Sequence, residues 1–179
     1  MLSQAEHGPD SQVVLLSDSS VFIDKVKEAL NDQLHTLPRA DIAAKALENS
    51  FSVVLDTISN CIQFSNKYAP EHLILVIENA EDYAEQIQNA GSVFLGKYSC
   101  ESVGDYASGT NHTLPTNGYA RSYSGVSLDS FVKKITFQNI SKLGLQNIGK
   151  AVEVMAEAEQ LLAHKNAVSI RLKKIQNEK

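Results

Sequence analysis

The sequence predicts an α/β fold with a mostly parallel sheet, followed by a helical C-terminal tail. Over the first two-thirds of the 179 residues, short apolar runs alternate with segments whose apolar residues recur at helical spacing. Strands that alternate with helices of this length are typical of βαβ units. Hydrophobic residues make up 43% of the chain, which is enough to bury a core, and the length suits one domain or one domain with an appendage.

Four apolar runs are the expected strands, and the first three lead into helical patterns. The run VVLL (13–16) precedes Ser19 and Ser20, which offer an N-cap to the helix that follows. Pro38 interrupts the chain, and ADIAAKALENS (40–50) is expected to form a second helix. The other expected strands are FSVVLD (51–56), HLILVI (72–77) and SVFLG (92–96), with helical patterns at 58–64 and 80–90.

The pattern changes after the fourth expected strand. Residues 99–124 are rich in Gly, Ser, Asn, Thr and Tyr, and a polar segment of this length is more often a functional loop than a passive one. Residues 131–137 are expected to form a short strand or a helical turn. A long helix follows, but its apolar stripe is too small to make the tail stable alone, so we expect the tail to dock on another surface, such as a second subunit.

Composition and charge argue against several classes of function. A net charge of −5 gives no support for nucleic-acid binding. Cys61 and Cys100 lie far apart and in no CxxC pattern, so neither a disulfide framework nor a zinc finger is indicated. No secretory signal pattern is visible, and the run LILVI (73–77) is too short to cross a membrane. We expect a cytoplasmic protein with reduced thiols.

The segment GSVFLGK (91–97) has the spacing of a phosphate-binding loop but not its chemistry. The next residue is Tyr98, where magnesium binding needs Ser or Thr. The intervening residues are apolar and strand-like, so their amides pair with neighbouring strands. No G-x-G-x-x-G pattern follows any expected strand, and the residues therefore encode no ordinary dinucleotide site.

The segment SQAEH (3–7) lies directly ahead of the first strand. If it forms a helical turn, Gln4 and His7 stand three residues apart and share one face. An amide oxygen and an imidazole on one face can hold a substrate or a metal. The alternative is a polar N-terminal turn without a function, as chain ends often are.

The segment APEHL (69–73) places Glu71 and His72 at the entrance of a buried strand, directly after Pro70. Proline restricts the backbone, so both side chains leave a rigid point. The histidine can act as a general base near neutral pH, and the adjacent carboxylate can orient it or activate water. The alternative is a histidine at a strand edge beside a solvated glutamate.

Two further segments carry candidate groups. Asp105 and His112 lie among small residues in GDYASGTNHTLPTNG (104–118), where Asp105 is either a metal ligand or a cap of an Asx turn. Glu159 and His164 lie near the end of the long helix, roughly 140° apart on a continuous helix. They can face one site only if the helix ends or bends between them. The alternative is a solvated glutamate and a histidine that favours the helix dipole.

Together, five segments resemble the C-terminal part of histidinol dehydrogenase, the last enzyme of histidine biosynthesis. The similarity covers nearly all 179 residues in the order and spacing of the family. Because family chains are more than twice as long, we expect this sequence to begin partway through a larger protein. The segments are SQAEHGPDSQ, APEHL, GSVFLG, GDYASGTNHTLPT and AEQLLAHKNAVSIR.

The resemblance implies a role for seven residues. Glu71 and His72 would form the acid/base pair, and Glu159 would contact the substrate. An oxygen- and nitrogen-rich metal site leaves room for nitrogen atoms of the substrate on the metal. The implied zinc ligands, which with His72 and Glu159 also form the substrate-binding set, are Gln4, His7, Asp105 and His164.

The implied reaction is the four-electron oxidation of L-histidinol to L-histidine by NAD, in two hydride transfers through histidinaldehyde. His72 would accept the proton of the alcohol, and Glu71 would help to activate water for the aldehyde. The main NAD contacts of the family lie N-terminal to this sequence, which agrees with the missing dinucleotide pattern. The chain alone is therefore expected to turn over little substrate. The alternative is a non-catalytic zinc- or imidazole-binding module derived from the enzyme.

The resemblance also implies a homodimer in which the helical tail reaches the active site of the partner. From the alternation of strands and helices, we expect residues 1–118 to form a Rossmann-like layered α/β domain that is part of a larger fold. Residues 119–179 would form the exchanged tail, which serves both dimerisation and the active site. His164 would then reach the zinc from a second chain.

Overall fold

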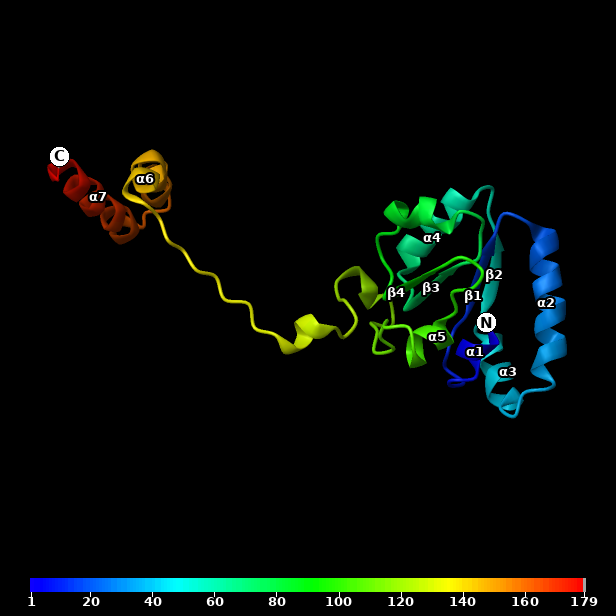
Figure 1. Ribbon diagram of the computed structural model, residues 1–179. Helices are drawn as coiled ribbons and strands as arrows, with labels where there is room; N and C mark the ends of the chain where they lie inside the picture. Colours follow the sequence, from blue (N-terminus) through cyan, green and yellow to red (C-terminus); the bar gives the residue numbers. More distant parts are fainter. Residues whose placement is uncertain (179) are drawn as a thin grey trace. The chain divides into compact units, whose positions relative to one another are not determined.

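The computed structural model describes residues 1–178 and comprises two compact units (Figure 1). The first unit is Met1–Val132, and the second begins at Lys133. The sequence places the domain boundary earlier, after residue 118. Residues 119–132, which contain two short 3₁₀ helices, belong to the first unit.

The first unit contains four strands, five α-helices and three 3₁₀ helices, in an order that alternates strands with helices. The strands are β1 (Val14–Ser17), β2 (Phe51–Val54), β3 (His72–Leu75) and β4 (Ser92–Leu95). The α-helices are α1 (Leu2–Ala5), α2 (Ser20–Leu34), α3 (Ala40–Glu48), α4 (Ile58–Tyr68) and α5 (Glu101–Tyr106). The 3₁₀ helices are η1 (Ala80–Gln86), η2 (Tyr119–Arg121) and η3 (Leu128–Phe131).

The strands form two parallel pairs. β1 pairs with β2, with Val14 opposite Phe51, and β3 pairs with β4, with His72 opposite Ser92. The predicted α/β class with parallel strands is confirmed. Within residues 1–178 the ladder consists of these two separate pairs rather than one continuous sheet. One side-chain hydrogen bond joins the segments that lead into the two strand pairs. Tyr68 Oη, at the end of α4, donates to Gln12 Oε1, ahead of β1, at 2.6 Å.

Local capping explains where the two helices beside these strands begin. Ser19 Oγ accepts a hydrogen bond from the Phe22 amide at 3.2 Å, as the sequence predicts for the N-cap of α2. Thr57 Oγ1 caps α4 in the same way. α4 ends at Ala69 in a left-handed conformation with φ 59°, and the next residue, Pro70, cannot continue a helix. The chain therefore turns sharply into β3.

The segment after β3 is a 3₁₀ helix, η1, where the sequence predicts an α-helix over 80–90. The Asn66 side chain of α4 accounts for its early end. Its Oδ1 accepts hydrogen bonds from the amides of Gln88 and Asn89 at 2.8 and 3.3 Å. These two amides therefore cannot donate hydrogen bonds to carbonyls of a helix, so the helical element ends before them, at Gln86.

A small core connects the N-terminal turn to the following helices. Ala5, Ala43 and Ala46 are fully buried, so α1 lies directly on α3. Since a helix of four residues is not stable alone, this contact is what holds α1 in place. The partly buried side chains that pack on this cluster are Leu2, Val13, Leu34, Leu37 and Leu47.

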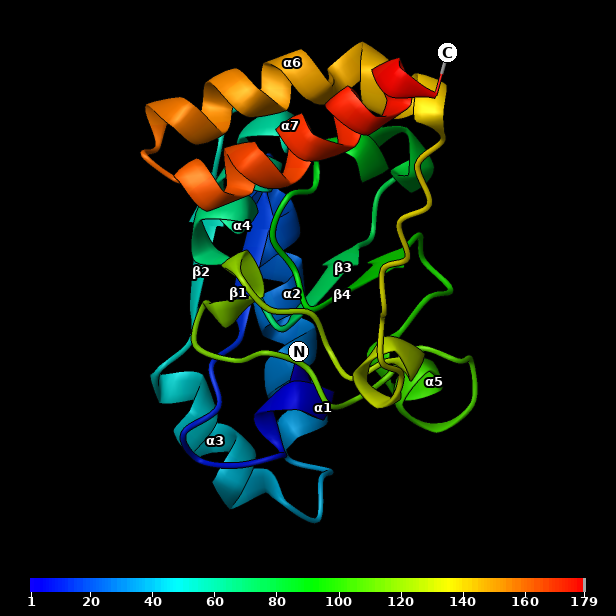
Figure 2. The ribbon, with the colours of Figure 1, turned by 90° about the vertical axis from the view of Figure 1, so that its left-hand side faces the viewer.

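The second unit is a helical hairpin of α6 (Lys142–Ala158) and α7 (Leu162–Asn177), which lie side by side (Figure 2). The sequence predicts one long helix here. The helix instead stops at Glu159, and Gln160 has a left-handed φ of 61°. The expected strand or turn at 131–137 is limited to η3, which ends at Phe131. No helix within residues 1–178 is both long and apolar enough to span a bilayer.

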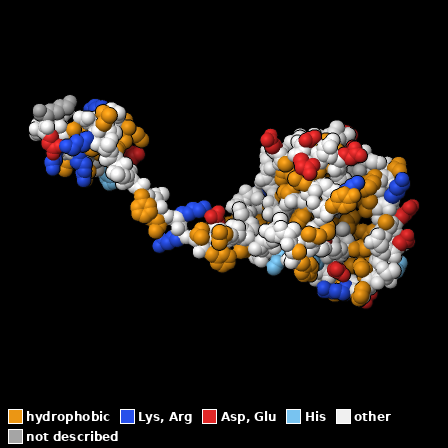
Figure 3. Space-filling model, in the orientation of Figure 1, with side chains coloured by type: hydrophobic (Ala, Val, Ile, Leu, Met, Phe, Trp, Pro, Cys, Tyr) orange, Lys and Arg blue, Asp and Glu red, His pale blue; other side chains and the backbone are white. Residues whose placement is uncertain are grey.

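The helical hairpin buries little of its own apolar surface. Only Gly149 and Ala156 of α6 are buried, and no residue of α7 is. Figure 3 shows apolar side chains on the surface of this unit. The docking of the tail on another surface stays a prediction. The exposed large apolar residues of the two helices are Leu143, Ile148, Val152, Val154, Met155, Leu162 and Ile170.

Candidate functional site

His72 occupies the first position of β3, where backbone hydrogen bonds of the preceding residues and a ring contact hold it in place. The Pro70 carbonyl accepts a hydrogen bond from the Gly91 amide, and the Glu71 carbonyl accepts one from the Ser92 amide, both at 2.9 Å. The imidazole of His72 stacks on the ring of Phe94 in β4, with centroids 5.9 Å apart and planes 23° apart. The ring is therefore held against the β3–β4 pair in a defined orientation.

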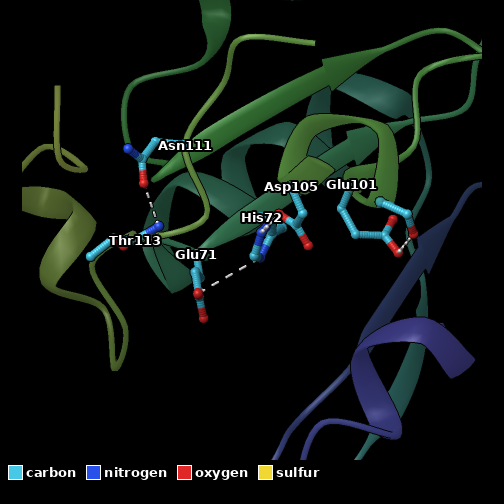
Figure 4. Close-up of polar contacts among 7 residues, drawn as sticks. Glu71, His72, Glu101, Asp105, Asn111 and Thr113 are labelled. Carbon is cyan, nitrogen blue, oxygen red and sulfur yellow. Dashed lines mark hydrogen bonds and ion pairs between the residues drawn. The ribbon is translucent and has the colours of Figure 1, made fainter. Parts of the chain in front are cut away.

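Two carboxylates flank this imidazole (Figure 4). Glu71 Oε1 lies 3.9 Å from Nδ1 of His72, and Asp105 Oδ1 lies 4.0 Å from Nε2. The His72 side chain is 11% exposed, and its buried Nε2 has no hydrogen-bond partner. The arrangement is suited to general acid/base chemistry.

Asp105 reaches this site because α5 approaches β4 at a glycine. A Cβ atom at Gly104 would lie 2.7 Å from Cε1 of Phe94 and 2.5 Å from Oγ1 of Thr110. Only glycine permits such a close approach. The Asx turn that the sequence offers as the alternative role of Asp105 is made by Asn111, whose Oδ1 accepts the Thr113 amide at 2.6 Å. Asp105 itself faces His72, as Figure 4 shows.

The N-terminal turn is present as α1, followed by a further turn in which the His7 amide donates to the Gln4 carbonyl at 3.3 Å. Gln4 places its side chain inside, where the buried Nε2 atom has no hydrogen-bond partner. Since a half-turn of the amide exchanges nitrogen and oxygen, this position can present an acceptor oxygen to a ligand. His7 is exposed, and its carbonyl accepts a hydrogen bond from Arg39 at 3.4 Å.

Glu159 and His164 lie on either side of the break between the two helices of the second unit. Glu159 is the C-cap of α6, and His164 lies in the first turn of α7. The left-handed Gln160 between them ends the continuous helix. The two side chains are therefore not held about 140° apart, as one continuous helix would hold them. Both side chains are exposed, and their convergence with the residues of the first unit stays a prediction.

The predicted zinc ligands are not gathered as one cluster in the part of the chain that the structure describes. Within residues 1–178, no three His, Cys, Asp or Glu side chains lie together as a metal-binding group. Among the predicted ligands, only His7 and Asp105 of the first unit are of these types, because Gln4 contributes an amide and His164 belongs to the second unit. The buried Gln4 amide nitrogen lacks a hydrogen-bond partner, and the ligand set stays a prediction.

Glu101 is a residue of the site that sequence reasoning missed. It begins α5, one helical turn before Asp105, and is only 5% exposed. Burial raises the pKa of its carboxyl group. Hydrogen bonding by Ser3, by its own backbone amide and by Ser102 opposes this effect, and the pKa lies below its usual value. The only feature of the sequence that could have pointed to Glu101 is its spacing of four residues from Asp105, which places both on one face of a helix.

Comparison with known proteins supplies the family. A family model described as histidinol dehydrogenase matches residues 1–172. The chain belongs to the histidinol dehydrogenase family. The resemblance of its five sequence segments to this family is thereby confirmed.

Two curated histidinol dehydrogenases illustrate the extent of the match. The chain is 58% identical over 172 residues to the enzyme of Bacteroides thetaiotaomicron, and covers 40% of it. It is 56% identical over 177 residues to the chloroplastic histidinol dehydrogenase of Arabidopsis thaliana, and covers 38% of it. The matches cover 96% and 98% of this chain. The chain therefore spans about 40% of the length of the curated relatives it matches.

A solved structure shares the fold. The crystal structure of histidinol dehydrogenase from Elizabethkingia anophelis matches with a TM-score of 0.91 and 64% sequence identity. The match covers 98% of this chain and 40% of that chain. The α/β architecture described above is therefore the one that histidinol dehydrogenases use over this part of their length.

Proposed function

We propose that this chain is the part of a histidinol dehydrogenase that carries its acid/base pair and its metal ligands. The reaction is the oxidation of L-histidinol to L-histidine by NAD, through the aldehyde. The observation that carries the proposal is the His72 imidazole, held between the carboxylates of Glu71 and Asp105 in a member of this family.

The alcohol and the aldehyde steps both need a group that takes up a proton. The Nε2 atom of His72 has no hydrogen-bond partner and would accept the hydroxyl proton as the first hydride leaves. Glu71 is 35% exposed, which leaves its carboxylate accessible to water. It would help to activate the water that adds to the aldehyde, and His72 would accept a proton again in the second oxidation.

Gln4, His7 and Asp105, together with His164 of a second chain, would hold a zinc ion. When bound, zinc supplies a Lewis acid that can take nitrogen atoms of the substrate as further ligands and so orient it. Glu159 would contact the same substrate. NAD would bind outside this chain, because the sequence holds no dinucleotide pattern. A homodimer with an exchanged tail and a cytoplasmic location complete the proposal.

Calorimetry and NADH absorbance test this function. We expect the zinc-loaded chain to bind L-histidinol weakly but to form only traces of NADH, since hydride transfer needs NAD next to the substrate carbon. In a full-length histidinol dehydrogenase that contains this sequence, His72→Asn should lower turnover by about 10²- to 10⁴-fold. Histidinol affinity should fall much less, because the zinc ligands and Glu159 remain.

The results separate this proposal from the alternative, a non-catalytic zinc- or imidazole-binding module, which the missing dinucleotide pattern favours. Equal affinity for imidazole and L-histidinol, with no NAD reduction by the full-length protein, would support the module. An unchanged rate in the full-length His72→Asn variant would remove this residue from the mechanism. Robust NAD reduction by the 179-residue chain would show that its NAD site lies within these residues.

A further inference from the structure

Asn66, near the end of α4, joins this helix to the segment that leads into β4. Its Nδ2 atom donates to the Gln86 carbonyl at 2.8 Å, and its Oδ1 atom accepts hydrogen bonds from the amides of Gln88 and Asn89 at 2.8 and 3.3 Å. The Asn89 side chain donates in return to the Asn66 carbonyl at 2.8 Å. These hydrogen bonds join residues 20 to 23 positions apart, so they hold two distant segments against each other.

The same two segments continue into β3 and β4, which carry the proposed base and its ring contact. The Gly91 amide donates to the Pro70 carbonyl at 2.9 Å, a few residues beyond the contacts of Asn66. Phe94 of β4 then stacks on the imidazole of His72, with ring centroids 5.9 Å apart. Asn66 therefore stands at the start of a continuous series of contacts that ends at His72.

The ladder between β3 and β4 is too short to set this alignment alone. Each strand has four residues, and no third strand joins this pair within the described part of the chain. A pair of strands this small is only marginally stable by itself. Residues 87–91, between η1 and β4, form no helix or strand, so their path depends on hydrogen bonds to neighbouring segments.

We propose that Asn66 is a positioning residue for the proposed base: it fixes the entry to β4, and so holds the Phe94 ring against His72. The inference rests on the proposed function, in which His72 accepts protons. The His72 side chain is 11% exposed, and its two ring nitrogens lie 3.9 Å from Glu71 and 4.0 Å from Asp105. A shift of Phe94 would let the imidazole turn, and both of these distances would change.

Hydrogen exchange in the 179-residue chain is the first test. Asn66→Ala removes the acceptor of two amides, which should exchange faster in any case. If the entry to β4 depends on Asn66, exchange at Gly91 and Ser92 should also rise at least several-fold by local opening, although their own acceptors are unchanged. The matched control is Gln63→Ala, which removes an exposed amide from the same helix and should leave these rates at their wild-type values.

The NMR resonances of the His72 ring are the second test, and they report on the ring contact itself. The ring current of an aromatic side chain displaces the resonances of protons near its face, so Phe94→Leu shows where they lie without the stack. Asn66→Ala should move Hδ2 and Hε1 of His72 from the wild-type positions toward those of Phe94→Leu. The spectra are recorded at a pH high enough to keep the imidazole neutral. Gln63→Ala should leave both resonances in place.

Turnover of a full-length histidinol dehydrogenase that contains this sequence is the third test. A misplaced base slows the chemical step more than it weakens substrate binding. Asn66→Ala should therefore lower kcat by about 10- to 100-fold, as small misplacements of reacting groups do. KM for L-histidinol should change much less. Gln63→Ala should keep the wild-type kcat and KM.

The outcomes keep this inference apart from the proposed function. A wild-type full-length protein that oxidises no L-histidinol contradicts the proposed function, and exchange and NMR then still decide whether Asn66 holds the His72 ring. Faster exchange confined to the two amides bonded to Asn66, with unchanged His72 resonances, overturns the positioning role. Displaced resonances with an unchanged kcat overturn it as well, since the ring would then need no fixed position.

A second variant decides if Asn66→Ala loosens the whole first unit. Asn89→Ala removes the hydrogen bond to the Asn66 carbonyl and leaves the Asn66 side chain in place. Displacement of the His72 resonances toward those of Phe94→Leu in this variant supports the positioning role. Wild-type positions of these resonances overturn it.

Discussion

At the scale of residues, the site depends on the close approach of a few side chains. His72 stacks on Phe94 and lies between the carboxylates of Glu71 and Asp105. The same Phe94 ring packs against Gly104, which precedes Asp105. Phe94 therefore touches both His72 and the helix that carries Asp105.

A methyl group at Gly104 tests this contact. Its Cβ would lie 2.7 Å from the Phe94 ring and 2.5 Å from Thr110 Oγ1, closer than atoms can pack, so the ring or the helix must move. We expect Gly104→Ala to lower the free energy of unfolding by about 1–3 kcal/mol, as overpacking does. Urea unfolding measures it. The exposed Tyr106→Phe on the same helix is the control, with an expected change within about 0.5 kcal/mol. Equal stability of wild type and Gly104→Ala would contradict this packing.

At the scale of elements, α6 and α7 pair through small residues and ion pairs. Gly149 allows Leu172 to pack closely, since a Cβ there would lie 2.9 Å from Leu172 Cδ1. Glu157 and Lys165 form an ion pair of 2.7 Å across the turn, and Lys142 pairs with Glu178 at the other end of the hairpin. These contacts close the hairpin after the chain leaves the helical path at Gln160.

The Glu157–Lys165 pair gives this hairpin a pH dependence. The hydrogen bond and the charge of Lys165 lower the pKa of Glu157 from its usual value. The folded state therefore binds this proton more weakly than the unfolded state. The contribution to stability is fully present above the usual glutamate pKa, and is lost as the pH falls through the lowered pKa of the folded state.

A carboxyl titration by ¹³C NMR measures the effect. Lys165→Ala should raise the pKa of Glu157 toward its usual value, because it removes both main causes of the shift. Lys173→Ala, which removes another lysine of α7, should leave the pKa where it is. An unchanged titration in Lys165→Ala would mean that the two side chains do not pair in solution.

At the scale of the whole molecule, the proposed metal site combines ligands from both units. Gln4, His7 and Asp105 belong to the first unit and His164 to the second. If His164 comes from a second chain, zinc binding and self-association are linked equilibria. Each should then strengthen the other.

Zinc content reports this linkage. His7→Asn should sharply lower the zinc retained after dialysis, because one ligand is lost, whereas the exposed His35→Asn at the end of α2 should retain wild-type zinc.

In the wild type, the apparent metal affinity should rise with protein concentration over the range in which the chain self-associates. Full zinc retention by His7→Asn would remove His7 from the ligand set. An affinity independent of concentration, in a chain that self-associates, would argue against a ligand from a second chain.

The sequence by itself determined the elements whose causes are local. The apolar runs mark the four strands, Ser19 caps α2, and Pro70 ends α4 ahead of Glu71 and His72. The five segments also indicated the family, which the comparison confirms. Hydrophobic period, caps and proline act within a few residues, so a linear sequence carries them in full.

Only the tertiary structure decided the features that depend on residues far apart in the chain. Asn66 of α4 shortens the element after β3, and the two strand pairs remain separate ladders. Gln160 adopts a left-handed conformation without the glycine or asparagine that usually marks one. Glu101 is buried although glutamate is rarely buried. No local pattern in the sequence predicts this burial, because it depends on packing that only folding creates.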